Sequence, residues 1–391
     1  MAKEEKKAPK LRFNGYTNDW ERKELNNILK INSGRDYKQL NSGNIPVYGT
    51  GGYMLSVNDK LSDTDAVGIG RKGTIDKPLY LKAPFWTVDT LFYCTSKENS
   101  DVKFIYLLFQ IINWKRYDES TGVPSLSKNT ISNIKTYVPK IEEQDYISKL
   151  FFSLDNTLQL HERKYEELTI IKQALLQKLF PKKDEIKPEV RYENFSDAWE
   201  QRKLVSLFSK FTDGDWIESK DQANTGIRLI QTGNIGITEF INKFGNEKWI
   251  SEETFKKLNC EEIFPGDIII SRLPDPAGRA CILPKLDTRM ITAVDCTIAR
   301  TSRETSAEFI VQYLSTQTYF KYVQSCLAGG TRQRISRKNL ANFNVSIPTE
   351  INEQKQIGFF FKQLDTLIAL HQCKLEKLKQ LKKFLLQNMF I

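Results

Sequence analysis

Arginine and lysine side chains gather at a few points between short apolar segments of this sequence. Arg71 and Lys72 stand between glycines in A-V-G-I-G-R-K-G-T-I, and Lys115 and Arg116 follow an aromatic-rich segment. A forked guanidinium can donate to two acceptors on a guanine edge or to a phosphate, whereas an ammonium acts as a point charge. These points are therefore predicted to contact nucleic acid, with a solvated surface charge as the alternative for any one of them.

The second half of the chain repeats this concentration of cations in the segment T-R-Q-R-I-S-R-K, and two further arginines bracket the P-D-P-A-G loop before it. The predicted contacts are Arg71, Lys72, Lys115, Arg116, Lys128, Arg272, Arg279, Arg332, Gln333, Arg334, Arg337 and Lys338. Over all 391 residues the formal charge is +10, from 58 basic and 48 acidic side chains. This excess favours a polyanionic partner over a purely structural role, although surplus lysine on a solvated surface is the simpler alternative.

Catalytic motifs are absent from the sequence. It contains neither the N/D-P-P-Y/F segment of methyltransferases that act on amino groups of bases nor the G-x-x-x-x-G-K-S/T loop that cradles nucleotide phosphates. The G-T-G-G at 49–52 is better explained as a hairpin turn, and Asp267 as a turn before a buried strand, than as parts of a cofactor loop or a nuclease centre. We therefore predict no catalytic residue in this chain.

Metal binding and export are likewise not favoured. Six scattered cysteines without a C-x-x-C pair, and only two histidines, leave little material for a Cys/His zinc site. The first ten residues are charged and polar, and no apolar run is long enough to span a bilayer. We expect no metal site, reduced thiols and a cytoplasmic location.

An internal duplication organises the elements that must position these side chains. The segment Pro9 to Leu25 recurs as Pro188 to Leu204, so that Arg12 aligns with Arg191 and Trp20 with Trp199 at an offset of 179 residues. Two long apolar-periodic segments recur instead at an offset of 210, so the second copy carries 210 − 179 = 31 more residues in its middle. A duplicated frame with a variable middle predicts two similar domains of different detailed structure.

The two long segments predict helices that pair with each other. Their apolar positions step alternately by four and three, which keeps one face toward a partner helix. The predicted seam is Ile147, Phe151, Leu154, Leu158, His161, Leu168 and Leu175 in the first copy and Ile357, Phe361, Leu364, Ile368, His371, Leu375, Leu378 and Leu385 in the second. The histidines are expected to pack in the seam and not to act in catalysis. Lys172 and Lys382, which also interrupt it, either reach out of the seam or set its register.

The expected fold class is α+β, with two repeated globular domains separated by an antiparallel coiled coil of pseudo-two-fold symmetry. The predicted parts are a disordered arm over 1–10, a first domain over 11–140, a first helix over 141–180, a linker over 181–190, a second domain over 191–350 and a second helix over 351–391. Within the domains, short β-branched and aromatic runs predict strands, including 44–55, 66–75, 85–94 and 290–300, and helices are expected over 103–115 and 307–324.

Taken together, the paired motifs resemble the specificity subunit of Type I restriction–modification enzymes. They are W-E-R-K-E-L and W-E-Q-R-K-L, and T-G-V-P-S-L-S-K-N-T-I and G-T-R-Q-R-I-S-R-K-N-L, and the resemblance extends from about Pro9 to the end. It implies two target recognition domains that each read half of a bipartite, asymmetric double-stranded DNA sequence, spaced by the helices, which dock two modification subunits. It also implies a non-catalytic chain. S-adenosylmethionine would belong to the modification (methyltransferase) subunits, and ATP and Mg to the restriction/translocase subunits.

Two other functional classes remain open from the sequence. One is a single-chain nuclease or methyltransferase with a recognition domain, which the missing motifs disfavour. The other is a coiled-coil adaptor that binds no DNA, which the +10 charge disfavours. A methylation assay on the isolated protein and salt-dependent duplex binding distinguish these alternatives.

Overall fold

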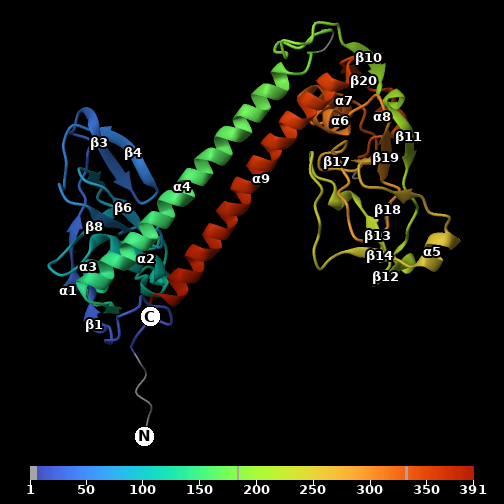
Figure 1. Ribbon diagram of the computed structural model, residues 1–391. Coiled ribbons are helices and arrows are strands. Elements are labelled where there is room, and N and C mark those ends of the chain that lie inside the picture. The colour runs from blue at the N-terminus through green and yellow to red at the C-terminus, as the bar shows by residue number, and fades with distance from the viewer. Residues whose placement is uncertain (1–6, 183–184, 331–332) are drawn as a thin grey trace. The chain divides into compact units, whose positions relative to one another are not determined.

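The computed structural model describes residues 7–182, 185–330 and 333–391. By its internal contacts the chain divides into unit 1, made of Met1–Glu162 and Cys373–Ile391, and unit 2, made of Arg163–Gln372. The long helices α4 (Ile141–Lys178) and α9 (Ile351–Asn388) each contribute to both units (Figure 1). Each unit thus contains one globular α+β part and one segment of each long helix, which confirms the predicted fold class.

The described residues of unit 1 form three small sheets, ordered β1-β9, β2-β8-β5-β6 and β4-β3-β7. The strands are β1 (Glu21–Glu24), β2 (Leu29–Ser33), β3 (Ser42–Gly49), β4 (Gly52–Val57), β5 (Ala66–Gly70), β6 (Leu79–Leu81), β7 (Trp86–Thr87), β8 (Leu91–Ser96) and β9 (Lys135–Val138). The shorter helices are α1 (Leu25–Ile28), α2 (Val102–Ile111), the 3-10 helix η1 (Trp114–Tyr117) and α3 (Lys128–Ser132). The G-T-G-G segment forms the predicted hairpin turn, because Gly49 and Gly52 pair across β3 and β4.

Unit 2 contains the sheets β10-β20, β11-β19-β16-β17 and β12-β14-β13-β18-β15. Its strands are β10 (Glu200–Lys203), β11 (Phe208–Asp213), β12 (Gln222–Ala223), β13 (Ile227–Ile230), β14 (Lys248–Ile250), β15 (Glu262–Ile263), β16 (Ile268–Ser271), β17 (Ala280–Ile282), β18 (Met290–Thr292), β19 (Cys296–Thr301) and β20 (Asn344–Ile347). Its shorter helices are η2 (Leu204–Leu207), η3 (Ser219–Asp221), η4 (Thr232–Asn234), α5 (Glu252–Lys257), α6 (Ala307–Tyr313), α7 (Gln317–Ser325) and α8 (Arg337–Asn342).

Two of the three sheets are built alike in both units, and the third differs. The four-stranded sheets have corresponding orders, β2-β8-β5-β6 and β11-β19-β16-β17. In the third sheet the antiparallel and parallel pairings of β4-β3-β7 recur in β14-β13-β18, to which unit 2 adds β12 and β15. The longer middle of the second copy is therefore built into the third sheet, which leaves the shared framework unchanged.

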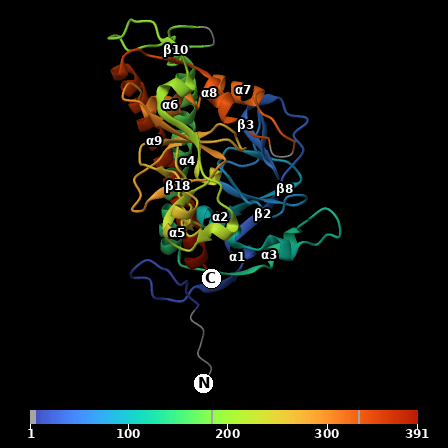
Figure 2. The ribbon, with the colours of Figure 1, turned by 90° about the vertical axis from the view of Figure 1, so that its right-hand side faces the viewer.

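Several predicted elements are divided in the structure. The run 85–94 forms β7 and β8 instead of one strand, and 290–300 forms β18 and β19. The helix expected over 307–324 is also two helices, because Thr316 caps α7 by accepting a hydrogen bond from the amide of Tyr319. In both views α6 lies against α9 (Figures 1 and 2), and Gly358 permits this approach, since a Cβ there would lie 2.6 Å from the amide nitrogen of Phe309.

The repeated opening motif is held to the long helices by a buried ion pair. In unit 1, Nε and Nη2 of Arg12 donate to the two carboxylate oxygens of Glu143, in the first turn of α4, at 2.6 and 2.7 Å. In unit 2, Arg191 donates to both oxygens of Glu353, in the first turn of α9, at 2.7 Å each. Hydrogen bonding to these carboxylates raises the pKa of both arginines. Each carboxylate is only 1% exposed, so both oxygens must be satisfied by protein donors.

The next residue in each helix, a glutamine, joins the helix to its globular part. Gln144 donates to the carbonyl of Pro139 at 2.9 Å and accepts from the amide of Asp101, the residue that caps α2, at 3.0 Å. Gln354 donates to the carbonyl of Pro348 at 3.0 Å and accepts from the amide of Ser306, which caps α6, at 3.0 Å. The E-Q pair of each helix thus fixes the direction in which the helix leaves its domain.

The end of each long helix closes the globular core that the other helix begins. Phe390, past the end of α9, contacts Trp20, Phe104 and Phe151 in unit 1, with ring centroids 5.5–6.2 Å apart. Phe180, past the end of α4, contacts the corresponding rings in unit 2: Trp199, Phe309 and Phe361, at 5.3–6.4 Å, together with Tyr313. Each core therefore needs residues from both long helices.

Part of the arm expected to be disordered is held in place. The carbonyl of Lys7 accepts a hydrogen bond from the amide of Trp20 at 2.8 Å, and the amide of Leu11 donates to the carbonyl of Asn388 at 2.8 Å. Residues 1–6 lie outside the described residues. The predicted linker makes the equivalent bonds, from Trp199 to the carbonyl of Ile186 and from Val190 to that of Lys178, both at 2.9 Å.

The antiparallel pairing predicted for α4 and α9 is observed within each unit. In unit 2 Lys172 of α4 pairs with Asp365 of α9, and in unit 1 Lys382 of α9 pairs with Asp155 of α4 at 2.6 Å. The residue numbers sum to 172 + 365 = 537 and 155 + 382 = 537, so the two helices keep one antiparallel register at both places. The seam lysines thus cross to the partner helix, which agrees with a role in setting register.

The beginnings of the seam are also part of the domain cores, which the apolar spacing alone did not indicate. Ile147, Phe151 and Leu154 belong to the core of unit 1. Ile357, Phe361 and Leu364 belong to the core of unit 2. His161 and His371 lie half-buried farther along the helices. The apolar repeat is therefore shared between helix pairing and the folding of each domain.

Candidate nucleic-acid interface

The turn after β5 presents Arg71 and Lys72 on the surface of unit 1. Gly70 enters this turn so tightly that a Cβ on it would lie 2.0 Å from the carbonyl oxygen of Thr74. The following loop is tied down by hydrogen bonds from Leu126 to the carbonyl of Arg71, at 2.9 Å, and from Gly73 to that of Pro124, at 2.8 Å. The segment T-G-V-P-S-L-S-K is thereby laid against the turn, and both motifs form one site.

Three of the predicted contact residues meet here, and two of them lie over one aromatic ring. The guanidinium carbon of Arg71 and the Nζ of Lys128 each lie 5.8 Å from the ring centroid of Phe92. Arg71, Lys72 and Lys128 are all exposed, and they line a cleft of about 500 Å³ together with Ser33, Ser125 and Ser127. We call Arg71, Lys72 and Lys128, with Ser33 and Phe92, the first cation cluster.

The carboxylate that also lines this cleft is engaged with neighbouring residues. Glu119 accepts hydrogen bonds from the hydroxyl of Thr130 and from the amide of Ser127, the latter at 3.3 Å. These bonds, chiefly that from Thr130, lower the pKa of Glu119. Its charge is therefore partly satisfied within the loop.

Lys115 and Arg116 lie elsewhere, exposed on η1. The turn is held by Trp114, whose indole donates to the carbonyl of Phe109 at 2.8 Å. Lys115 pairs with the carboxylate of Asp76 at 3.0 Å and lowers the pKa of that group. Because this pair is largely exposed, it contributes little stability and leaves Lys115 accessible to a ligand.

Unit 2 builds a site on the same backbone framework. The amide of Ile335 donates to the carbonyl of Arg272 at 3.1 Å, as the amide of Leu126 does to the carbonyl of Arg71. The amide of Arg272 in turn donates to the backbone carbonyl of Asp295, as the amide of Arg71 does to that of Thr90. Ser336 caps α8 as Ser127 caps α3, and so Arg337 takes the position of Lys128. Asp213 pairs with Thr297 across β11 and β19, as Ser33 pairs with Phe92 across β2 and β8. Asp213 therefore corresponds to Ser33, and Thr297 corresponds to Phe92.

The side chains on this second framework are paired with acids. Asp213 accepts from the hydroxyl of Thr297 at 3.1 Å and lies 3.6 Å from Nε of Arg272 and 3.7 Å from Nε of Arg337. Arg334 lies 3.9 Å from Asp295. The side chains of Arg334 and Arg337 are 63% and 45% exposed, whereas that of Arg272 is 11% exposed. We call Arg272, Arg334 and Arg337, with Asp213 and Thr297, the second cation cluster.

The structure gives Arg279 a structural role, contrary to its predicted contact with nucleic acid. It is buried, and its guanidinium donates to the backbone carbonyls of Thr232, Ile235, Leu273 and Pro276 at 2.6–2.9 Å. Gln333 and Lys338 are exposed beside the second cluster in sequence. Arg332 lies outside the described residues.

Groups that could have done chemistry are held in structural roles. Asp267 is 3% exposed and accepts from both Nε and Nη2 of Arg300 at 2.8 Å, which confirms its interpretation as a structural residue before a buried strand. Burial raises the pKa of the Cys94, Cys281 and Cys296 thiols to about 12. Within the described ranges, no three His, Cys, Asp or Glu side chains are grouped as metal ligands would be.

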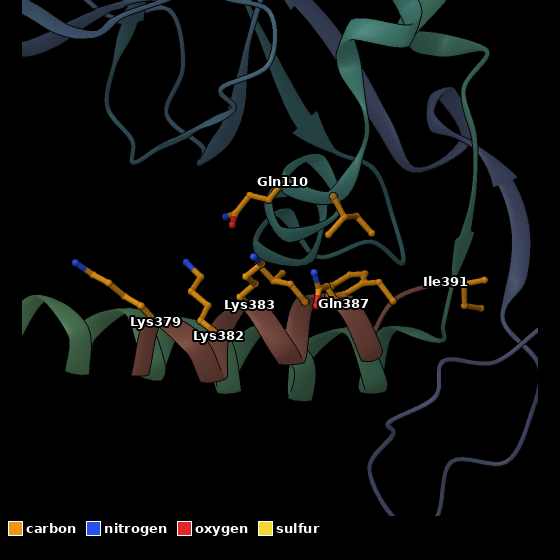
Figure 3. Close-up of a pocket in the computed structure, with 9 residues that line it drawn as sticks. Gln110, Lys379, Lys382, Lys383, Gln387 and Ile391 are labelled. Atoms are coloured by element: carbon orange, nitrogen blue, oxygen red, sulfur yellow. The ribbon is translucent and has the colours of Figure 1, made fainter. Parts of the chain in front are cut away.

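A groove repeats at equivalent positions on the long helices. In unit 1 it has a volume of about 570 Å³ and lies between α2 and α9, where Gln110 projects toward Lys379, Lys382 and Lys383 (Figure 3). Leu386 also lines this groove. In unit 2 a groove of about 480 Å³ is lined by Gln173, Leu176 and Gln177 of α4 and by Phe180 just past its end. At the offset of 210 these correspond to Lys383, Leu386, Gln387 and Phe390, which line the first groove.

The two clusters are also shaped by four residues that the sequence did not indicate: Ser33, Phe92, Asp213 and Thr297. They lie in strands far from the cationic motifs in sequence. The available signal was the glycine that follows each strand. A Cβ on Gly34 would lie 2.0 Å from the carbonyl of Val88, and one on Gly214 would lie 2.3 Å from that of Thr292.

Among the described residues, no helix has the length and apolar character needed to cross a membrane.

Two curated relatives of this chain are specificity subunits of Type I restriction enzymes. The specificity subunit of the Type I restriction enzyme MjaVIII from Methanocaldococcus jannaschii is 24% identical over 279 residues, which are 69% of this chain and 64% of that protein. The putative MjaX specificity subunit from the same organism is 23% identical over 292 residues, 71% of this chain and 65% of that protein. The chain thus spans slightly less than two thirds of the length of these curated relatives.

The fold is also shared with a solved structure. The crystal structure of the Type I restriction–modification system S subunit from M. genitalium superposes with a TM-score of 0.71 over 98% of this chain and 99% of that one, at 15% identity. The sequence model described as the Type I restriction modification DNA specificity domain matches residues 17–169 and again residues 196–380. The chain therefore belongs to the Type I restriction modification DNA specificity domain family and carries two copies of the domain.

Proposed function

We propose that this chain is the DNA sequence-specificity subunit of a Type I restriction–modification complex, in which each globular domain reads one half of a bipartite target. The observation that carries the proposal is one backbone framework, present in both units, that presents exposed cations with different neighbours. Arginine and lysine bind phosphate and base edges. A shared frame with divergent side chains is what the reading of two different half-sites requires.

The reaction belongs to partner subunits in this proposal. Modification subunits bind S-adenosylmethionine and methylate adenine, and restriction subunits use ATP and Mg to translocate and cleave DNA. The absence of the N/D-P-P-Y/F and phosphate-loop motifs from the sequence supports this division. The names of the relatives, which are specificity subunits of restriction enzymes, support it as well.

The long helices are proposed to dock two copies of the modification subunit. Apolar side chains that a soluble helix pair would bury remain exposed at duplicated positions: Leu160 and Leu370 are 54% and 46% exposed, and Ile171 and Leu381 are 47% and 45% exposed. Exposed apolar patches of this kind mark protein contacts. Because the same positions recur in each half of the chain, two identical partners fit better than one.

Methylation mapping tests the proposal directly. The full chain is assembled with a purified candidate modification subunit and S-adenosylmethionine, and methylated adenines are mapped on genomic DNA. We expect a bipartite motif whose halves are separated by unspecified bases. Replacing the middle of unit 1 with that of another family member should change one half and leave the other unchanged. A continuous motif, or methylation that does not depend on this chain, would refute the assignment.

The same preparation separates the alternatives. Methylation or cleavage by the isolated chain, freed of partners by denaturation and refolding, would favour a stand-alone enzyme. Partner assembly without any duplex binding would favour an adaptor. Replacing Leu160 and Leu370 with aspartate should abolish co-elution with the modification subunit while circular dichroism stays unchanged. Replacing the exposed Gln159 with aspartate introduces the same charge about 100° around the helix from Leu160, so this variant serves as the control and should not affect assembly.

A further inference from the structure

The two cation clusters occupy equivalent positions, but their charge balance differs. In the first cluster, none of Arg71, Lys72 and Lys128 lies within 4.0 Å of a carboxylate in the part of the chain that the structure describes. The position that Ser33 occupies there is taken by Asp213 in the second cluster. Glu119, the carboxylate that lines this cleft, bonds to Ser127 and Thr130 and pairs with none of the three cations. The first cluster therefore keeps an excess of positive charge, whereas in the second cluster carboxylates lie directly beside the arginines.

The backbone leaves little freedom for either residue to turn away. Ser33 and Asp213 end β2 and β11, and each is followed by the glycine that approaches a neighbouring carbonyl too closely for any Cβ. Ser33 lines the cleft of about 500 Å³ beside Arg71 and Lys128. Asp213 lies 3.6 and 3.7 Å from Arg272 and Arg337. The residue at this position, Ser33 in unit 1 and Asp213 in unit 2, thus determines whether the neighbouring cations have a carboxylate beside them.

The first cluster matches the chemistry of a phosphate. A guanidinium and two ammonium groups supply positive charge, and the hydroxyls of Ser33, Ser125 and Ser127 can donate to phosphate oxygens in the same cleft. The ring of Phe92 makes cation–π contacts with Arg71 and Lys128, which limits the positions that their side chains can take. The second cluster disfavours phosphate binding, because the carboxylates of Asp213 and Asp295 would repel the anion.

We propose that the first cluster binds a backbone phosphate of DNA, and that Asp213 closes the equivalent position of unit 2 to phosphate. The arginines of the second cluster that remain exposed, Arg334 and Arg337, are then left for uncharged base edges. Asp213 acts here as a positioning residue, since its carboxylate lies between a nearly buried arginine and an exposed one. This inference rests on the proposed function and adds where unit 1 holds the DNA backbone.

The duplication supplies its own test, because each residue can be exchanged for its counterpart. Binding of the full chain to its target duplex and to random duplexes is measured by fluorescence anisotropy between about 50 and 200 mM salt. Each phosphate contact contributes about −0.9 to the slope of log K against log salt. Ser33→Asp should therefore flatten the slope by about 1 and weaken every duplex by the same factor. Asp213→Ser should steepen the slope by about 1.

Two further variants keep the result interpretable. Lys72→Ala should reproduce the loss seen with Ser33→Asp without introducing a new carboxylate, and Lys164→Gln, on the surface of α4, should leave both slope and affinity unchanged. An unchanged slope in Ser33→Asp and Lys72→Ala, or a loss confined to one sequence, would overturn the phosphate site. If the unaltered chain itself shows no salt-dependent duplex binding, the proposed function fails as well, which distinguishes the two outcomes.

Discussion

The buried ion pairs that join the opening motifs to the long helices give a prediction with an internal comparison. Glu143→Gln and Glu353→Gln keep the shape of each side chain but remove its charge. Arg12 and Arg191, each 13% exposed, then lose their charged partner. Breaking a buried pair by removal of one partner lowers the free energy of unfolding by about 3 kcal/mol or more. Because both carboxylates are 1% exposed, solvent screening does not reduce this value.

The two variants should differ by one hydrogen bond. The indole of Trp199 donates to Glu353 at 3.2 Å, whereas the buried indole nitrogen of Trp20 has no hydrogen-bond partner among the described residues. A buried hydrogen bond to a charged group contributes about 1.5 kcal/mol or more. We therefore expect Glu353→Gln to destabilise unit 2 by about 1 kcal/mol more than Glu143→Gln destabilises unit 1, because the glutamine oxygen still accepts weakly from the indole.

Hydrogen exchange followed by mass spectrometry measures the two units separately. Peptides from 12–25 and 141–150 report on unit 1, and peptides from 191–204 and 350–360 report on unit 2. Glu167→Gln is the matched control, since the pair of Glu167 with Lys164 is solvent-exposed and should contribute little to stability. Protection factors in Glu143→Gln and Glu353→Gln that match this control would refute the role of the ion pairs. Equal losses in the two variants would refute the contribution of Trp199.

Other perturbations test the helices and the loops. One heptad inserted in each long helix at facing positions, after Leu168 and after Leu367, preserves the register and adds about 10 Å. If the helices space the half-sites, as the family resemblance implies, the methylated motif should gain roughly three unspecified base pairs, and an unchanged spacer with full activity would contradict that role. Exchanging Lys382 and Asp155 should restore most of the thermal stability lost in Lys382→Asp alone, as scanning calorimetry would show; equal losses would mean that the two side chains do not interact. Arg279→Ala should lower the melting temperature of unit 2 by several degrees through the loss of four hydrogen bonds, and weaker DNA binding at unchanged stability would restore Arg279 to the interface.

Much of this architecture follows from sequence because its signals are local or repeated. The seam needs only the spacing of apolar residues along one helix, and duplication marks the frame, since Arg12 and Arg191 recur beside the same tryptophan. Cations in glycine-flanked turns indicate exposed positions, and Arg71, Lys72 and Lys128 are exposed as expected. The division of 307–324 into two helices was not predicted, because its cap is a single threonine within an apolar run.

Only the tertiary structure distinguished arginines that look alike in the sequence. Arg272 and Arg279 bracket the same loop, yet Arg279 is buried because carbonyls from 232–235 and 273–276 converge on it. Asp213 and Ser33 gained their importance in the same way, from strands that bring them beside distant cations. Periodicity and repetition are properties of contiguous residues and can be read directly. The charge around a side chain depends on which distant segments meet there, and the packing of the whole domain determines that.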